Sequence, residues 1–217
     1  MRFSLSRVRA LFIPTLFIPI VVGYAGAFGT FGALAAEAVT GSARAGEPEN
    51  LNAAQLMRML AQAPSPRASF VEKKYLSVLK APLESSGELL FLPPDHLEKR
   101  TISPKPETLV LDGDTLTIER NQKKRSISLR SYPEVDALVG SIRSALAGDR
   151  ERLARSYRIE VDGTRDRWRL VLLPSDPAIA ALVSRLLMTG VRTRIESIET
   201  LQANGDRSVM TIQPVRD

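Results

Sequence analysis

Three dipeptides divide the chain into short segments whose apolar and polar residues alternate. They are Asp112-Gly113, Asp162-Gly163 and Asn204-Gly205. Asp-Gly and Asn-Gly accept the positive φ angles that a type I′ turn requires, so each dipeptide predicts a tight β-hairpin. With no βαβ alternation between them, the segments predict an antiparallel sheet in neighbour-to-neighbour order. About ten strands are expected, at residues 68–79, 87–92, 97–102, 108–111, 115–119, 125–129, 157–161, 168–173, 191–201 and 209–213.

Alternation within these strands predicts that the sheet has one apolar face. Leu116 and Ile118, for example, alternate with Thr115, Thr117 and Glu119. Successive side chains of a strand point to opposite faces, so each such strand has one dry face and one wet face. A long one-sided antiparallel sheet twists and curls, and its concave apolar side must be covered.

Three helical patterns can supply the cover. The first runs over residues 53–61 behind the capping residue Asn52. The second runs from Pro133 to 147, before Gly148, and the third from Pro177 to Gly190. The two longer patterns carry continuous apolar stripes, formed by Val135, Leu138, Val139, Ile142 and Leu146, and by Ile179, Leu182, Val183, Leu186 and Leu187. The predicted fold class is therefore α+β, a curled antiparallel sheet with three helices over its concave face.

The segment at 87–92, Gly-Glu-Leu-Leu-Phe-Leu, does not alternate. Leu89 and Phe91 fall on one face of the predicted strand, and Leu90 and Leu92 fall on the other. One face can pack on the core while the other lines a cavity, or both can pack against helices. Both interpretations stay open.

Residues 1–45 are predicted to be a secretory signal. Arg2, Arg7 and Arg9 precede a stretch without charge at 11–36, and two small-residue cleavage patterns follow, at 33–35 and 43–45. A retained membrane anchor is the alternative, because this stretch is long enough to span a bilayer. The remaining residues, 46–217, are expected to form a single domain in the periplasm.

Charge and composition exclude several classes of function. Removal of the signal takes away four arginines and one glutamate, so the formal net charge falls from +6 to about +3 and no longer favours nucleic acid. The chain has no cysteine, which excludes thiol catalysis, thiolate metal sites and N-terminal lipidation of the chain itself.

The sequence also gives no sign of an enzyme. His96 is the one histidine of the chain, and its neighbour Asp95 cannot act as its orienting partner within a turn. The chain has no G-x-S-x-G motif, metal-ligand cluster, phosphate loop or nucleotide fingerprint. We therefore expect no catalysis, metal or cofactor.

The order of motifs resembles the periplasmic outer-membrane lipoprotein carrier family (LolA-like), and most closely its divergent LolA-related branch. The resemblance covers about residues 50–214 and rests on Phe70 early in the first long strand, on Ser-Ser-Gly-Glu-Leu at 85–89, on Pro-x-x-Leu at 94–97 and on Asp-Gly-x-x-Leu at 112–116. It implies an unclosed β-barrel with helices as a lid over an apolar cavity. The family carries a lid-holding arginine where this chain has Pro93, which leaves lid control and a lipoprotein cargo open.

The resemblance implies a periplasmic carrier that shields the acyl chains of a lipid or lipoprotein between an inner-membrane transporter and an outer-membrane acceptor. The alternative is a cargo-free envelope adaptor. The expected lipid-binding residues are Phe70, Leu89, Phe91, Leu97, Leu116, Ile118, Val135, Leu138, Val139 and Ile142. The helix at 133–147 is expected to move when cargo enters. A basic cluster of Arg120, Lys123, Lys124 and Arg125 is the candidate for docking to anionic membranes or to a partner, and solvated turns are its simpler explanation.

Overall fold

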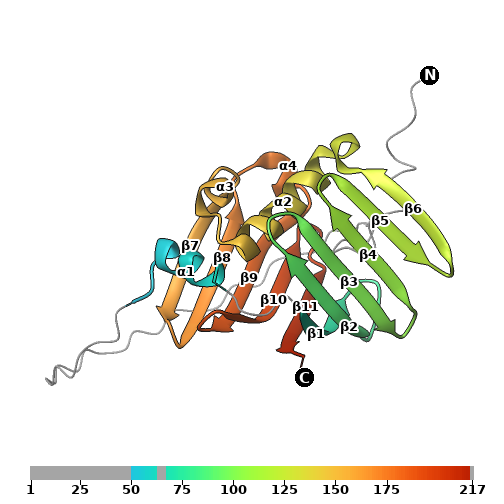
Figure 1. Ribbon diagram of the computed structural model, residues 1–217, viewed down its shortest axis with the longest axis horizontal. Coiled ribbons are helices and arrows are strands. Elements are labelled where there is room, and N and C mark those ends of the chain that lie inside the picture. The colour runs from blue at the N-terminus through green and yellow to red at the C-terminus, as the bar shows by residue number, and fades with distance from the viewer. Residues whose placement is uncertain (1–49, 63–66, 216–217) are drawn as a thin grey trace, which may run out of the picture.

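The computed structural model describes residues 50–62 and 67–215, so the predicted signal at 1–45 lies outside the described residues. The described chain forms one antiparallel sheet of eleven strands in the order β6-β5-β4-β3-β2-β1-β11-β10-β9-β8-β7. The strands β1 and β11 meet in the middle of this order, and β6 and β7 form its two ends. The sheet is curled and unclosed, with its helices on one face (Figure 1), and this confirms the predicted fold class.

The strands are β1 (Arg67–Tyr75), β2 (Leu83–Leu92), β3 (His96–Ser103), β4 (Glu107–Asp112), β5 (Thr115–Arg120), β6 (Lys123–Ser128), β7 (Tyr157–Thr164), β8 (Arg167–Pro174), β9 (Val183–Val191), β10 (Arg194–Gln202) and β11 (Arg207–Pro214). The helices are α1 (Ala53–Leu60), the short 3₁₀ helix η1 (Leu129–Ser131), α2 (Pro133–Ala147), α3 (Arg150–Ala154) and α4 (Pro177–Ala180).

The turn dipeptides lie at or close to the hairpins that they predict. Gly113 opens the β4–β5 turn, and Gly205 lies in the β10–β11 turn, each with positive φ. The β7–β8 turn falls at residues 165–166, three residues later than expected, because Gly163 is still paired with Trp168. Gly163 has φ +94°, and a Cβ there would meet the carbonyl oxygen of Arg167 at 2.3 Å, so this glycine serves the strand rather than the turn.

The first two predicted helices are confirmed. Asn52 caps α1 through a reciprocal pair of hydrogen bonds with Gln55, each 2.9 Å long. Pro133 begins α2, and Gly148, with φ +73°, ends it in the left-handed conformation. The short helix α3, capped by Asp149, was not predicted.

The third predicted helix is wrong beyond its first turn. Asp176 caps α4, but α4 ends at Ala180, and residues 183–191 form β9. This strand pairs with β8 on one side and β10 on the other, so neighbouring strands satisfy its backbone. A run such as Leu186-Leu187-Met188 fits both a buried helix and a buried strand, and only these partners decide between them.

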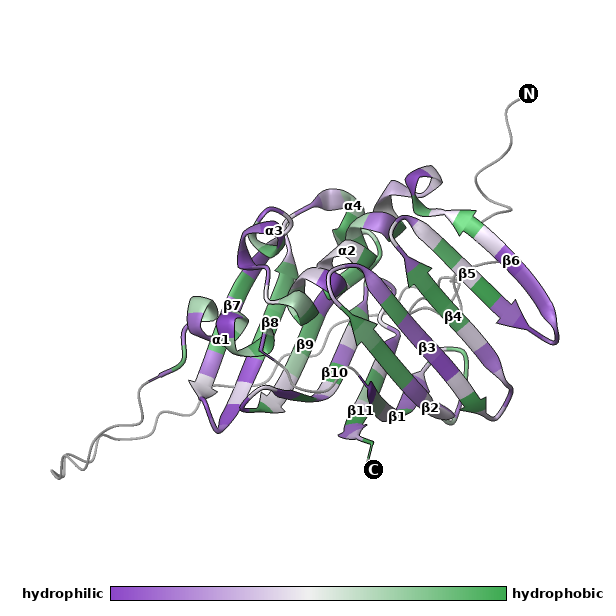
Figure 2. Cartoon of the chain, in the orientation of Figure 1, coloured by the Kyte–Doolittle hydropathy of each residue, from purple (hydrophilic) through white to green (hydrophobic). Residues whose placement is uncertain are grey.

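Two apolar clusters fill the space between helices and sheet. The larger joins α1, α3 and α4 to β7–β10 around Trp168, Leu170 and Met188. The smaller joins η1 and the first turns of α2 to β4 and β5 around Leu111 and Leu116. In Figure 2, β2, β4 and β8 carry long hydrophobic stretches, whereas β6 is largely hydrophilic. The helix α2 contributes to both clusters and crosses between them.

None of the described helices is both long enough and apolar enough to cross a membrane.

Candidate functional site

A cavity of about 330 Å³ lies between α2 and the concave face of the sheet. Its lining is mostly apolar, includes four basic residues, and comes from α1, α2 and both halves of the sheet. The helices contribute Leu60, Val139, Ile142, Arg143 and Leu146. The strands before α2 contribute Arg67, Ala68, Leu89, Leu90, Phe91, Leu97, Lys99 and Leu111. The strands after α2, with the β9–β10 turn, contribute Thr193, Arg194, Ile195, Ile198, Met210, Ile212 and Pro214.

One face of α2 covers the cavity. Val139, Ile142, Arg143 and Leu146 follow the i, i+3, i+4, i+7 spacing of a single helix face. Ile142 is only 8% exposed although it borders the cavity, so the helix shields the space beneath it from solvent. The packing of α2 therefore decides how wide the cavity is.

The non-alternating segment of β2 lies at the edge of this cavity. Leu89, Leu90 and Phe91 all line it, whereas Leu92 is 45% exposed. The pairing of β1 with β2 begins at Arg67 opposite Leu90, so the end of β2 extends beyond β1. Both faces of β2 reach the cavity there, which explains why neither face is polar.

Five of the ten expected lipid-binding residues line the cavity: Leu89, Phe91, Leu97, Val139 and Ile142. The other five do not line it. Leu116, Ile118 and Val135 belong to the smaller apolar cluster, where they pack against each other and against Leu129. Leu138 faces the larger cluster instead. All four fill the core between α2 and the sheet.

Phe70 is the fifth of these residues, and Lys99 separates it from the cavity. Phe70 is 2% exposed, and the ammonium of Lys99 lies 4.9 Å from the centre of its ring. Lys99 comes from β3 and lines the cavity in its place. The cation over the ring contributes about 1 kcal/mol or more when it is desolvated, as here.

A buried charged cluster surrounds Lys99. Its ammonium donates to Glu72 Oε2 at 2.5 Å, and the hydroxyl of Ser208 donates to Glu72 Oε1 at 2.6 Å. Lys74 Nζ lies 3.7 Å from Glu72. The Glu72 side chain has no exposed surface, so this pairing is what makes its charge tolerable on the inner face.

Burial and neighbouring opposite charges shift the pKa values of Glu72 and Lys74 in opposite directions. Burial alone would raise the pKa of Glu72, but Lys99, Lys74 and the hydrogen bonds from Lys99 and Ser208 together hold the pKa below its ordinary value of 4.5. The pKa of Lys74 is lowered, chiefly by burial and further by Lys99, and Glu72 and Glu107 only partly offset this. The inner face thus changes from apolar at the cavity to charged beside it.

Arg143 fastens α2 to the turns beneath it. Its guanidinium donates to the backbone oxygen of Gly113 at 2.8 Å and to that of Asp95 at 3.4 Å. These oxygens belong to the β4–β5 and β2–β3 turns. No local sequence pattern predicts this contact, because it joins residues 30 and 48 positions apart.

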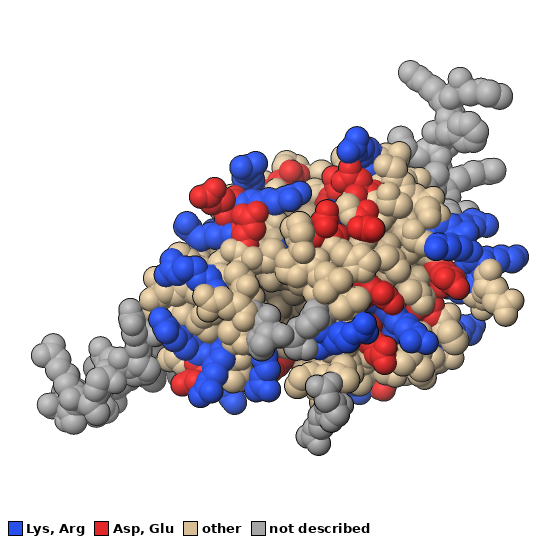
Figure 3. Space-filling view, in the orientation of Figure 1, with Lys and Arg blue, Asp and Glu red and all other residues tan. Residues whose placement is uncertain are grey.

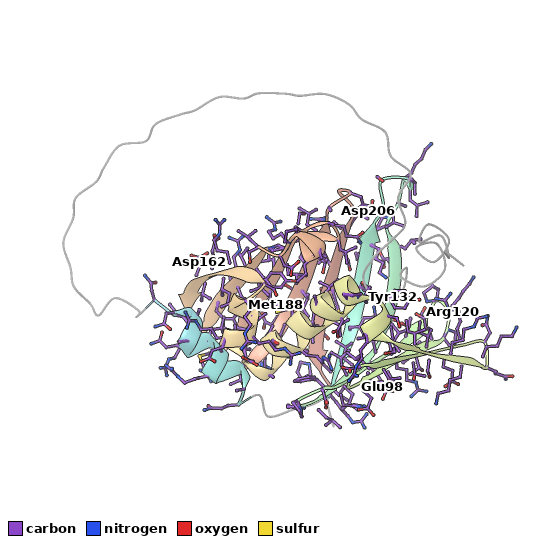
Figure 4. The ribbon with its side chains drawn as sticks, turned by 90° about the horizontal axis from the view of Figure 1, so that it is seen from above. Glu98, Arg120, Tyr132, Asp162, Met188 and Asp206 are labelled. Carbon is purple, nitrogen blue, oxygen red and sulfur yellow. The ribbon has the colours of Figure 1, made fainter. Side chains whose placement is uncertain are left out.

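The basic cluster lies on the β5–β6 hairpin, and none of its four residues lines the cavity. Asn121 and Gln122, both with positive φ, form its two-residue turn. All four basic residues are exposed, and the Nε of Arg120 donates to Glu107 at 2.7 Å. Figure 4 shows Arg120 toward the outer end of the hairpin, away from α2.

His96 begins β3, with its Nδ1 3.9 Å from the exposed carboxylate of Asp112. Over the part of the chain that the structure describes, no group of three His, Asp or Glu side chains could hold a metal ion.

Residues 45–213 match the family described as outer membrane lipoprotein carrier protein LolA-like. No curated protein matches the chain. Among solved structures, a LolA superfamily protein from Nitrosomonas europaea is 12% identical, with 77% of this chain and 94% of that chain covered and a TM-score of 0.42. An outer membrane lipoprotein-sorting protein domain from Vibrio parahaemolyticus is also 12% identical, with coverage of 76% and 93% and a TM-score of 0.41. In the MucA/MucB complex of Pseudomonas aeruginosa, the matching chain is 13% identical, with coverage of 75% and 56% and a TM-score of 0.41.

Proposed function

Because the chain belongs to the LolA-like family of outer membrane lipoprotein carrier proteins, we propose that it carries a lipid across the periplasm with an acyl chain inside the cavity under α2. Members of this family are binding or carrier proteins of the cell envelope. In this proposal the chain shields its cargo from water and performs no catalysis. Cargo is received at the inner membrane and delivered at the outer membrane.

The observation that carries this proposal is the apolar cavity itself. An acyl chain gains about 0.8 kcal/mol for each methylene that leaves water, so a chain of roughly fourteen carbons needs on the order of 10 kcal/mol of shielding. Leu, Ile, Val and Met side chains of the lining provide such shielding without a fixed polar geometry. A carrier must also release its cargo, and a lining of this kind holds a chain without binding one shape tightly.

Export is part of the proposal and rests on the sequence at 1–45. Docking to an anionic membrane or to an acidic partner is assigned to the exposed basic residues of the β5–β6 hairpin. Lys and Arg side chains gather at that end of the molecule in Figure 3. Each basic residue near an anionic bilayer contributes about 1 kcal/mol.

Native mass spectrometry of the protein purified from its host tests the proposal. The expected result is bound acyl lipid on the wild type and much less on Ile142→Asn, which places an amide in the cavity lining. The matched control is Val171→Asn, because Val171 is 6% exposed, close to the 8% of Ile142, and does not line the cavity. Both variants are expected to lose about 1–3 kcal/mol of stability through a buried amide.

The control should keep its lipid. Equal loss of lipid from both variants would mean that stability, not the cavity, controls binding. A wild-type protein with no lipid, and with envelope proteins bound instead, would replace the carrier by the cargo-free adaptor.

A further inference from the structure

The cavity opens at the edge of the sheet where three strand ends lie together. Arg67 begins β1, Pro214 ends β11 and Arg194 begins β10, and these strands are neighbours in the sheet. Ala68 is paired with Pro214, and Ser197 of β10 is paired with Thr211 of β11, so the three ends fall on the same edge. Arg67, Arg194 and Pro214 line the cavity and are nevertheless exposed. The cavity therefore reaches solvent between them.

The charged residues that line the cavity all have one sign. Its lining includes four basic residues, Arg67, Lys99, Arg143 and Arg194, and none of its described lining residues is Asp or Glu. Lys99 and Arg143 are buried, at 4% and 7% exposed, whereas Arg67 and Arg194 are exposed. Arg67 and Arg194 are the two cations at the opening.

Arginine at such a position selects a particular headgroup. A guanidinium stays charged at every physiological pH and presents parallel N–H donors that match a carboxylate or a phosphate. A cationic headgroup would be repelled, and a neutral one would gain no ionic contact. The aliphatic cavity behind the two arginines takes only the tail.

The size of the cavity limits the number of tails. Pockets for small ligands hold about 300–1,000 Å³, and a cavity of about 330 Å³ lies at the lower end of that range. One acyl chain is a better match to this volume than several chains side by side.

We propose that the cargo is a single-chain amphiphile with an anionic headgroup, a carboxylate or a phosphate, whose tail fills the cavity and whose headgroup contacts Arg67 and Arg194. This inference rests on the proposed carrier function and specifies its cargo. The amphiphile enters tail first at the edge formed by β1, β11 and β10.

Calorimetric titration with three probes that share one acyl chain tests the inference. The probes are palmitate, palmitoyl lysophosphatidic acid and the neutral monopalmitoylglycerol, each added to delipidated protein below its micelle concentration. Wild-type protein is expected to bind both anionic probes roughly tenfold more tightly than the neutral one, because two exposed ion pairs contribute up to about a factor of five each. Higher salt should reduce this difference.

The decisive variant is Arg67→Gln/Arg194→Gln. It should lose the tenfold preference and bind the neutral probe as the wild type does. Arg169→Gln is the matched control, because Arg169 is an exposed arginine of β8 that does not line the cavity. It should keep the preference.

The outcomes separate the two proposals. Tighter binding of either anionic probe supports the inference, and the better one identifies the headgroup as carboxylate or phosphate. Equal affinity for all three probes, or an equal loss of all three in the double variant, overturns the anionic headgroup and leaves the carrier intact. Failure of all three probes to bind wild-type protein overturns the carrier function itself.

Discussion

At the scale of single residues, the inner face of the sheet joins a charged cluster to an apolar cavity. Glu72, Lys99 and Ser208 come from β1, β3 and β11, so the cluster joins strands from both halves of the sheet. A buried ion pair of this kind adds little net stability, yet it is costly to break on one side only. The cluster reaches the wall of the cavity through Lys99. An acyl chain that extended past the apolar lining there would contact charged groups.

Lys99→Met should destabilise the protein by about 3–5 kcal/mol, because it removes the closest partner of the buried Glu72 carboxylate. The double variant Glu72→Gln/Lys99→Met removes the buried charge as well and should recover most of that loss. Urea unfolding of the two variants and the wild type measures this. A double variant as unstable as Lys99→Met would show that the pair does not carry the effect.

Acid should weaken the wild type through Glu72. Its pKa in the folded protein is lowered below 4.5, so its contribution to stability is present above that value and is lost as the pH falls through the lower folded pKa. Glu72→Gln lacks this contribution, and its free energy of unfolding should fall less between about pH 5 and about pH 2. The measurement is chemical unfolding across that range. Parallel pH profiles for both proteins would contradict the assignment.

At the scale of elements, α2 is the helix that joins the two halves of the fold. Val135 and Val139 pack in the smaller cluster, and Leu138 and Ala145 pack in the larger one. The helix at 133–147 is expected from the sequence to move when cargo enters, and Pro93 stands where the family carries a lid-holding arginine. Arg143, on α2 itself, makes a comparable connection to two turns.

Arg143→Met keeps most of the aliphatic volume and removes the donors to Gly113 and Asp95. Amide hydrogen exchange of α2 should become faster, while exchange of β8 and β9 stays unchanged, because the lost bonds involve only α2 and the two turns. Arg100→Met, on β3, is the control, since its side chain is exposed and does not line the cavity. Unchanged exchange of α2 in Arg143→Met would rule out an anchoring role.

Cargo should also change the exchange of α2 if this helix is the lid. Val139 and Ile142 then exchange sheet contacts for contacts with the acyl chain. The comparison is hydrogen exchange of the wild type with and without palmitate. Equal protection of α2 in both states, at the level of the central strands, would make it an ordinary core helix.

At the scale of the whole molecule, the cavity lies where the two halves of the sheet meet. The strands before α2 and those after it each form a continuous series of hairpins, and only the β1–β11 pair joins the two series. Ala68, Ile212 and Pro214 of this pair line the cavity. A ligand at this place contacts both halves at once and stabilises their association.

A bound ligand should therefore raise the stability of the entire fold. At a free concentration about a hundred times its dissociation constant, it should add about 2.7 kcal/mol to the free energy of unfolding. Thermal unfolding at increasing palmitate concentration measures this as a rising Tm. The Ile142→Asn variant should show a much smaller rise, and a Tm independent of palmitate in the wild type would argue against a site in the folded state.

Local chemistry accounts for most of what could be predicted about the fold. The Asp112-Gly113 turn, the Asn52 cap and the stripe of α2 depend on residues within a few positions of each other, and each lies where the pattern predicts. The segment at 183–191 was assigned wrongly, because its identity as a strand depends on β8 and β10. Five of the ten expected lipid-binding residues line the cavity, because an apolar stripe does not distinguish residues that line a cavity from residues that pack in the core.

The sequence by itself therefore determined the antiparallel hairpins, the first two helices and the need for helices to cover an apolar face. Only the tertiary structure decided where a cavity remains between the helices and the sheet. The β1–β11 pairing brings Ala68 beside Pro214, residues far apart in the described chain, and together with the β10–β11 pairing it places Arg67 and Arg194 on one edge. The same folding brings Lys99 onto Glu72 and over the ring of Phe70. These contacts join residues far apart in the chain, and the free energy that selects them comes from burial over the whole sheet rather than from any local pattern.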